Sequence, residues 1–310
     1  MTQAMGAGLS AQRVNVKSTK PTPPLAPVGG TAQVVAMTRP ERLDRSLIAV
    51  TGPDTRGFLQ NLLTQDLDRL PAGGVIYAAL LSPQGKVSAD MLVWAHDDGV
   101  VLDAAGSRGG DLLRKLTMYK LRADVAIEDV SDKMSIAVSD APFAGALRDP
   151  RLDGLGFRGL SDDTSPPAAQ AYEARRIALG APDLAIDAQP EEVFAGEALL
   201  EELNGVAFDK GCFVGQENVS RMKRRATTRK KFCPIAFEGE AIAYGAPVLA
   251  GAAEIGSVRS SIAGRAIALL RLDRAADAAA AGQRLTVQGR EIRLDPPPWL
   301  ILPQREDAPD

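Results

Sequence analysis

The residues best suited to chemistry lie in one short segment around Cys212. Gly211 precedes this cysteine and Gly215 follows it, and glycine adopts positive φ angles without strain, so the backbone can hold the thiol out toward solvent. If Gln216 begins a helix, the positive end of that helix and the charge of Lys210 would both lower the pKa of the thiol. The segment therefore predicts a reactive or metal-contacting cysteine. The alternative is that Cys212 is a small buried hydrophobic residue, the usual role of a single cysteine.

The remaining cysteine and the single histidine are weaker candidates for a chemical role. Cys233 lies in the apolar run of residues 232–235, where packing is the simpler expectation. His96 stands beside two aspartates in a predicted turn and lacks the partners that a metal site or a nucleophilic triad needs. We therefore expect no metal site made by this chain alone.

Seven basic residues follow the cysteine segment within eleven positions: Arg221, Lys223, Arg224, Arg225, Arg229, Lys230 and Lys231. They form either a solvated linker between domains or a site for an anionic partner, such as the glutamate tail of a folate or an RNA. No aromatic residue that could stack on a base lies among these charges. Nucleic acid is therefore the less favoured partner.

The composition indicates a globular protein with several cores. The chain has 310 residues, 45% of them hydrophobic and 24% charged, and single domains seldom exceed about 200 residues. A net charge of −3 provides no general attraction to nucleic acid or to an anionic membrane. Two cysteines are too few for a disulfide framework, which favours a reducing compartment. No apolar run approaches the roughly 18 residues of a membrane-spanning helix, so we expect no membrane partner.

The first 36 residues differ from the rest of the chain. Residues 1–36 contain no acidic residue, are rich in proline and show no sustained apolar period, which predicts a disordered leader. A transit peptide is one alternative, although this segment has a single arginine and no amphipathic helix. Met37 begins the first segment with an ordered pattern, so a second alternative is that translation starts at Met37 rather than at Met1.

Apolar periodicity and turn residues predict the elements that position these groups. Strands are expected at residues 47–50, 75–81, 87–95, 100–104, 125–128 and 135–138, with later ones at 234–237, 266–272, 284–287 and 291–294. Helices are expected after residues 52–54 and at 111–121, 172–179 and 197–203. Residues 140–167 are rich in Gly, Asp and Pro and are predicted as loops. The late, short strands favour a small barrel or sandwich.

The cysteine segment resembles the K-G-C-[FY]-x-G-Q-E signature of the YgfZ family. The matching residues are Lys210, Gly211, Cys212, Phe213, Gly215, Gln216 and Glu217. The similarity extends over most of residues 43–295, including the turn at residues 82–86 and Tyr172 with Arg176 ahead of Gly180.

The resemblance implies an α+β fold of three lobes, like that of the glycine-cleavage T-protein (GcvT), with a small C-terminal β-barrel. The first lobe would be discontinuous and would combine residues 37–130 with 185–228. The second α+β domain would cover residues 131–184, and the barrel residues 229–310.

The function implied by the resemblance is assembly or repair of iron–sulfur proteins, above all four-iron proteins, through the motif at residues 210–217. Partners would be iron–sulfur carrier proteins and four-iron client enzymes, among them the radical enzymes that thiolate tRNA. Cofactors would be tetrahydrofolate and a transient iron–sulfur cluster in contact with Cys212. The compartment would be the cytoplasm of a bacterium, or the mitochondrial matrix of a eukaryote.

The folate contacts implied by the resemblance are Tyr172, Asp90 and Arg176. The aminomethyltransferases hold the pterin with a glutamate where this chain has Ala178, and they carry a paired acid where this chain has Ala89 before Asp90. These departures imply weaker folate binding and no classical enzyme. A folate-dependent aminomethyl or one-carbon transferase is the alternative function, and an RNA-binding module acting through residues 221–231 is a third.

Overall fold

The computed structural model describes residues 37, 39–163, 165–224 and 228–303. The predicted disordered leader, residues 1–36, lies outside these described residues. Among the helices within them, none is both long and apolar enough to cross a lipid bilayer.

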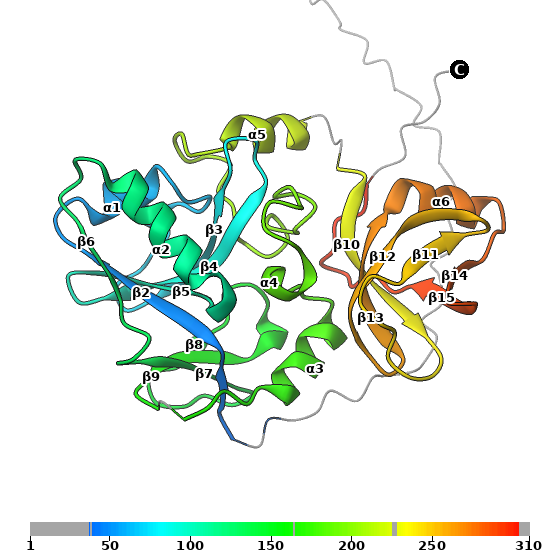
Figure 1. Cartoon of the computed structure of the whole chain (residues 1–310), viewed down its shortest axis with the longest axis horizontal. Coiled ribbons are helices and arrows are strands. Elements are labelled where there is room, and N and C mark those ends of the chain that lie inside the picture. Colours follow the sequence, from blue (N-terminus) through cyan, green and yellow to red (C-terminus); the bar gives the residue numbers. More distant parts are fainter. Residues whose placement is uncertain (1–36, 38, 164, 225–227, 304–310) are drawn as a thin grey trace, which may run out of the picture. The chain divides into compact units, whose positions relative to one another are not determined.

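An antiparallel sheet of five strands forms the first part of the fold (Figure 1). Its strands, in spatial order, are β3 (Val75–Leu81), β4 (Val87–His96), β5 (Gly99–Ala105), β2 (Arg45–Thr51) and β6 (Ala126–Asp129). Side chains alternate between two cores, as the two-residue period of a strand requires. Ile48 of β2 belongs to the core that contains α1 (Thr55–Gln60) and α2 (Gly106–Lys120), while its neighbour Leu47 belongs to the other core. The strands predicted here are confirmed.

A second sheet of four strands packs into the other core. Its spatial order is β1 (Glu41–Leu43), β7 (Ser135–Ser139), β9 (Phe157–Ser161) and β8 (Leu147–Arg148), and the 3-10 turn η2 (Asp153–Leu155) precedes β9. The prediction of loops over residues 140–167 is therefore wrong for β8 and β9. The alternation of β9 is hidden because its inward-facing residue is the polar Arg158, which is 1% exposed.

Two short helices follow, and a series of turns then leads to the cysteine segment. Helix α3 (Gln170–Leu179) ends at Gly180, whose φ of +77° is the left-handed conformation typical of a helix stop. The second helix is α4 (Leu184–Asp187). One other short element, the 3-10 turn η1 (Leu67–Arg69), lies between α1 and β3. The helix predicted at residues 197–203 is wrong: those residues form turns, because Leu199 adopts a φ of +60° that no α-helix contains.

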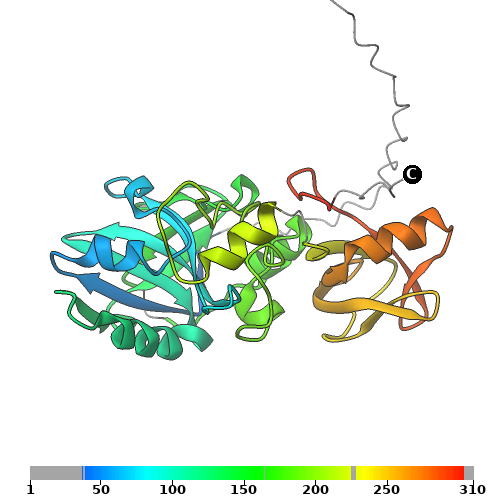
Figure 2. The same ribbon diagram turned by 90° about the horizontal axis from the view of Figure 1, so that it is seen from above.

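The C-terminal part is a closed barrel of six strands. Around the barrel they are β10 (Lys230–Phe237), β13 (Arg265–Arg271), β12 (Ala253–Ile262), β11 (Pro247–Ala250), β14 (Leu285–Val287) and β15 (Arg290–Leu294), which pairs back to β10. Helix α6 (Leu272–Ala280) lies over one end (Figures 1 and 2). The predicted fold class, with a small C-terminal barrel, is confirmed.

Candidate functional site

The cysteine segment is a loop that leads into helix α5 (Gln216–Arg224), so a helix does begin at Gln216. Cys212 is exposed, whereas Cys233 of β10 is fully buried and burial raises the pKa of its thiol to about 12. The two thiols therefore differ sharply in access to solvent and partners. Cys212 is the one that a partner molecule can reach.

Lys210 anchors the start of the loop to the end of α1 and the turn that follows it. Its Nζ donates hydrogen bonds to the carbonyl oxygens of Gln60, Leu63 and Gln65, over 2.7, 2.8 and 2.9 Å. Burial lowers the pKa of this ammonium to about 8, against the opposing influence of nearby aspartates. The hydrogen bonds of Lys210 go to the main chain rather than to Cys212, so its observed role is to position the loop.

A close approach between two glycines fixes the other end of the loop. Gly215 has a φ of +81°, and a Cβ there would lie 2.7 Å from the carbonyl oxygen of Ser82 and 3.0 Å from the Cα of Gly85. Asn218 of α5 donates from Nδ2 to the carbonyl oxygen of Gln84 over 2.6 Å. The β3–β4 hairpin thus supports the loop and α5, and Figure 1 shows the hairpin tip beside α5.

Of the other motif residues, one packs in the core and the others lie at the surface. Phe213 is buried in the core, with the Lys210 ammonium 5.3 Å from its ring centre. Gln216 donates from Nε2 to the carbonyl oxygen of Gly211 over 3.3 Å, while Glu217 is exposed. Gly211 has no positive φ, and a Cβ there would meet nothing within 4 Å. Only Gly215, therefore, uses the backbone freedom expected of both glycines.

Two charges of the basic run, those of Lys223 and Lys231, are paired with acids of the same chain. Lys223 pairs with Glu201 and lies 4.0 Å from the ring centre of Phe208. Lys231 is buried against Glu202. Arg225 lies outside the described residues. These pairs reduce the net positive field of the run, which weakens the case for a general anion site there.

Tyr172 lines a separate cavity of about 510 Å³ between α3, the start of α2 and the strands of both sheets. Its hydroxyl accepts hydrogen bonds from Arg151 Nη2 over 2.7 Å and from Arg158 Nη2 over 2.9 Å. None of the motif residues 210–217 lines this cavity. The structure therefore does not bring the cysteine segment and Tyr172 into one site.

A buried ionic network forms the wall behind Tyr172. Asp149 pairs with Arg151 over 2.6 Å and with Arg158 over 3.4 Å, and Arg158 also reaches Asp103. Burial alone would raise the pKa of Asp149, but the two guanidinium groups and their hydrogen bonds outweigh it and lower the pKa to about 2. The arginines thus hold Tyr172 in place while their charges are largely balanced.

Two further carboxyl groups belong to this region. Asp183 lines the cavity and accepts from the main-chain N–H of Ala185, whereas Asp90 accepts from the hydroxyl of Tyr77 over 2.9 Å and does not line the cavity. Burial and the charge of Asp183 raise the pKa of Asp90. Although burial opposes it, Arg176 and another nearby arginine lower the pKa of Asp183. The pKa values of the two carboxyl groups are thus shifted in opposite directions, and Asp183 is the stronger acid of the pair.

Arg176 has a different place from the one expected of a folate contact. Its Nη1 donates to Asp187 Oδ2 over 2.9 Å and its Nη2 to Ser260 Oγ over 2.8 Å, and Asp187 also accepts from the main-chain N–H of Ser260. Arg176 does not line the cavity of Tyr172. It joins α3 and α4 to strand β12 of the barrel, which is a structural role.

The sequence did not identify Asp183, Arg151 or Arg158 as site residues. Arg151 and Arg158 lie in the segment interpreted as loops, and Asp183 follows a Gly-Ala-Pro helix stop, so each resembles a surface charge. The only local indication was the spacing of Asp149 and Arg151, two residues apart, which suits a side-chain ion pair.

Among the described residues, no group of three or more His, Cys, Asp or Glu side chains is placed to hold a metal ion. A cluster brought to Cys212 would therefore find a single cysteine ligand there. The other ligands would have to come from a second molecule.

The fold and its parts match known proteins. A family model described as the GCVT N-terminal domain matches residues 44–145, and one described as the CAF17 C-terminal beta-barrel domain matches residues 229–301. The crystal structure of glycine cleavage system aminomethyltransferase T from Bartonella henselae aligns with 84% of this chain and 85% of that one, with a TM-score of 0.64 and 16% identity. The molecule thus has an aminomethyltransferase-like fold with a C-terminal barrel.

Sequence relatives narrow this class. The human iron–sulfur cluster assembly factor IBA57, mitochondrial, is 30% identical over 271 residues, which are 74% of this chain and 76% of the human protein. The mouse protein of the same name is 30% identical over 242 residues, 66% of this chain and 68% of that one. The chain belongs to the CAF17/IBA57 family, in which IBA57 is the eukaryotic homologue of YgfZ, and the resemblance found in the sequence is confirmed.

Proposed function

We propose that this protein is an assembly or repair factor for iron–sulfur proteins, above all four-iron ones, and that Cys212 is its point of contact with a cluster. The observation that carries the proposal is the presentation of this thiol: it is exposed, while the residues on either side of it are fixed to the main body of the fold. Relatives that are named iron–sulfur cluster assembly factors support the same role.

The geometry suits transfer rather than storage of a cluster. Iron–sulfur clusters are held by several cysteine thiolates, and Cys212 offers one. A cluster bound between Cys212 and a carrier protein would be held by few bonds from this side, so it could leave with the partner or pass to a client enzyme. Carrier proteins and four-iron client enzymes are the partners that we propose, in the bacterial cytoplasm or the mitochondrial matrix.

The test compares the two cysteines in cells that lack the wild-type protein. Cys212→Ala should depress the activity of four-iron enzymes while the purified variant keeps its thermal unfolding temperature. Cys233→Ala, the matched control, removes the buried thiol and should leave the four-iron enzymes active. Full enzyme activity with Cys212→Ala would remove the thiol from the mechanism.

We also propose that the cavity of Tyr172 holds a tetrahydrofolate. The residues fit a pterin in kind: Tyr172 supplies an aromatic wall, and Asp183 supplies an ionised carboxylate for the amino and ring N–H donors of the pterin. Asp183 could stand in for the glutamate that Ala178 replaces. Bound folate would supply a one-carbon carrier, and this chain would orient it through Asp183 and Tyr172.

Calorimetric titration with tetrahydrofolate tests the cavity independently of the thiol. Asp183→Asn should weaken binding by about 10-fold, because a charged acceptor is worth about 1.5 kcal/mol more than a neutral one. Cys212→Ala should bind folate as the wild type does. Equal affinities for wild type and Asp183→Asn would show that the pterin does not use this carboxylate, and absence of binding would remove folate from the proposal.

A further inference from the structure

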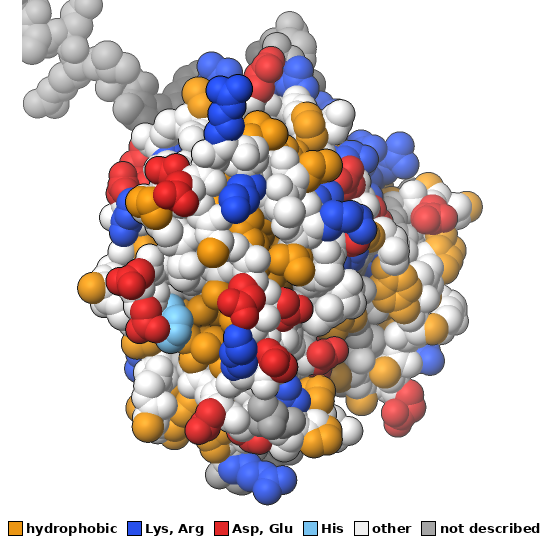
Figure 3. Space-filling view, turned by 60° about the vertical axis from the view of Figure 1, so that its left-hand side comes forward, with side chains coloured by type: hydrophobic (Ala, Val, Ile, Leu, Met, Phe, Trp, Pro, Cys, Tyr) orange, Lys and Arg blue, Asp and Glu red, His pale blue; other side chains and the backbone are white. Residues whose placement is uncertain are grey.

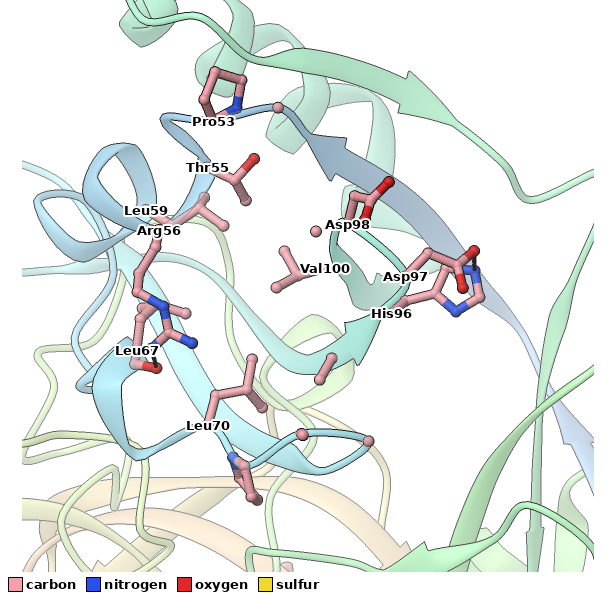
Figure 4. Close-up of a pocket in the computed structure, with 16 residues that line it drawn as sticks. Pro53, Thr55, Arg56, Leu59, Leu67, Leu70, His96, Asp97, Asp98 and Val100 are labelled. Carbon is pink, nitrogen blue, oxygen red and sulfur yellow. Dashed lines mark hydrogen bonds and ion pairs between the residues drawn. The ribbon is translucent and has the colours of Figure 1, made fainter.

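A second cavity, larger than that of Tyr172, lies at the end of β4 opposite the β3–β4 hairpin that supports the cysteine loop. Its volume is about 750 Å³, and it lies between α1 with the following turn η1 and the β4–β5 hairpin (Figure 4). None of its lining residues belongs to the cysteine motif or to the cavity of Tyr172. Nothing in the proposed function uses it.

The floor of this cavity is apolar. Leu59, Leu67, Leu70 and Val100 line it, and all four are buried in the described structure. Figure 3 shows a hollowed, hydrophobic area of surface beside the molecule's one histidine, with acidic side chains close by. A concave apolar surface with a few convergent polar groups is the usual form of a small-molecule site.

One polar side chain in the wall lacks a partner. The side chain of Thr55 lines the cavity, the residue is only 6% exposed, and its Oγ1 forms no hydrogen bond within the described structure. A buried hydroxyl without a partner costs about 1–3 kcal/mol, so such groups normally bond to protein, water or ligand. A ligand that offers a hydrogen-bonding group beside Thr55 would remove this deficit.

The rim selects the charge of that ligand. Asp98 is exposed and has neither a hydrogen-bond nor an ion-pair partner among the described residues, and Asp97 meets only His96, over 3.4 Å. Arg56, the one arginine or lysine in the lining, already donates to the carbonyl oxygen of Leu67 and pairs with Asp68 over 3.1 Å. Free negative charge thus faces the cavity while the positive charge is engaged, which favours a cation.

The walls are held in place by the backbone. Gly52 has a φ of +115°, and a Cβ there would lie 2.6 Å from the carbonyl oxygen of Asp124. At Gly99, which pairs with Thr51 on the neighbouring strand, a Cβ would lie 2.2 Å from the carbonyl oxygen of Val50. Both glycines therefore pack directly against main chain, which fixes this part of the cavity lining.

We propose that this cavity binds an organic cation: an apolar body of about the size of an aromatic ring system, which carries a protonated amine. The body would lie on the leucine floor, the ammonium would face Asp98, and a polar group would reach Thr55. This site goes beyond the proposed function and does not depend on it.

Because the chain has a single histidine, His96, its NMR signal can report binding at this cavity alone. In full-length protein with ¹³C-labelled histidine, one imidazole resonance reports on the rim of the cavity. Tryptamine should shift this resonance in a saturable way at millimolar concentration. Indole-3-propionate, which has a similar ring but a carboxylate, should not.

Substitutions then locate the contacts. Thr55→Val, which keeps the shape of the side chain, should weaken tryptamine binding by about 2- to 10-fold, and Thr55→Ser should restore it. Asp98→Asn should weaken it by about 2- to 5-fold, as for an exposed ion pair. Asp132→Asn removes an exposed acid outside the cavity and should change nothing. No saturable shift, equal binding of the propionate, or wild-type affinity in both Thr55→Val and Asp98→Asn would each overturn the proposal.

Discussion

The contrast between Gly211 and Gly215 offers the sharpest test of how the cysteine loop is held. Both flank Cys212, and sequence patterns alone treat them alike. Only Gly215 has a positive φ, of +81°, and only there would a Cβ meet the β3–β4 hairpin. Replacing each glycine in turn with alanine should therefore give opposite results.

The expected magnitude follows from three contributions at Gly215. An alanine held in a left-handed conformation costs about 1–2 kcal/mol. Its Cβ would lie 2.7 Å from the carbonyl oxygen of Ser82, a backbone atom that cannot rotate away, which adds about 1–3 kcal/mol. Alanine also lowers the conformational entropy of the unfolded chain, which offsets about 0.4–1 kcal/mol of this destabilisation. Gly215→Ala should thus lose about 1–5 kcal/mol of unfolding free energy, whereas Gly211→Ala should gain about 0.4–1 kcal/mol.

Urea unfolding at 25 °C, followed by circular dichroism, measures both differences. The rate at which Cys212 reacts with a thiol reagent under native conditions gives a second readout, because a displaced loop should present the thiol differently in Gly215→Ala. If the two variants were equally stable and reacted alike, the contact between the hairpin and the loop would not be what fixes the thiol.

Three further predictions concern other parts of the site. Lys210→Met should lower the unfolding free energy by about 1–3 kcal/mol at pH 7, measured with urea, because it leaves three carbonyl oxygens without their donor. The folded pKa of Asp149 is about 2, below its unfolded value, so this carboxylate contributes about 2 kcal/mol of unfolding free energy above pH 5 and loses that contribution as the pH falls toward 2. Measuring the unfolding free energy against pH should show this drop. Asp149→Asn should be less stable at pH 5, and its stability should fall less steeply in acid. A thiol reagent should find one reactive thiol, Cys212, in native protein and two in urea, and prompt reaction of Cys233 in native protein would contradict its burial.

Most of the first sheet could be predicted because its strands are short apolar runs bounded by turn residues. Val75–Leu81 was predicted to the residue, since apolar side chains occupy it and turn residues bound it. Strand β9 escaped prediction because Arg158, an arginine buried by its ion pairs, occupies a core position. A charged residue whose partners are distant in sequence cannot be distinguished from a surface charge by pattern.

Partners that are distant in sequence also limited the prediction of the candidate sites. The cysteine segment was found because its informative residues are adjacent and because the eight-residue signature is specific. The role of Lys210 depends on carbonyl groups that lie far earlier in the chain, and the role of Arg176 depends on Ser260 in the barrel. Local spacing contains neither relation, so only the folded structure reveals them.

The bonds of Lys210 also set the order of events as the chain folds. They join positions 145 to 150 residues apart, and closing a loop of that length costs about 4 kcal/mol of chain entropy unless the intervening strands have already paired. A nascent chain therefore exposes the carbonyl groups after α1 to water long before their donor is synthesised. The loop that carries the thiol therefore reaches its final position only after α1 and the turn that follows it have folded.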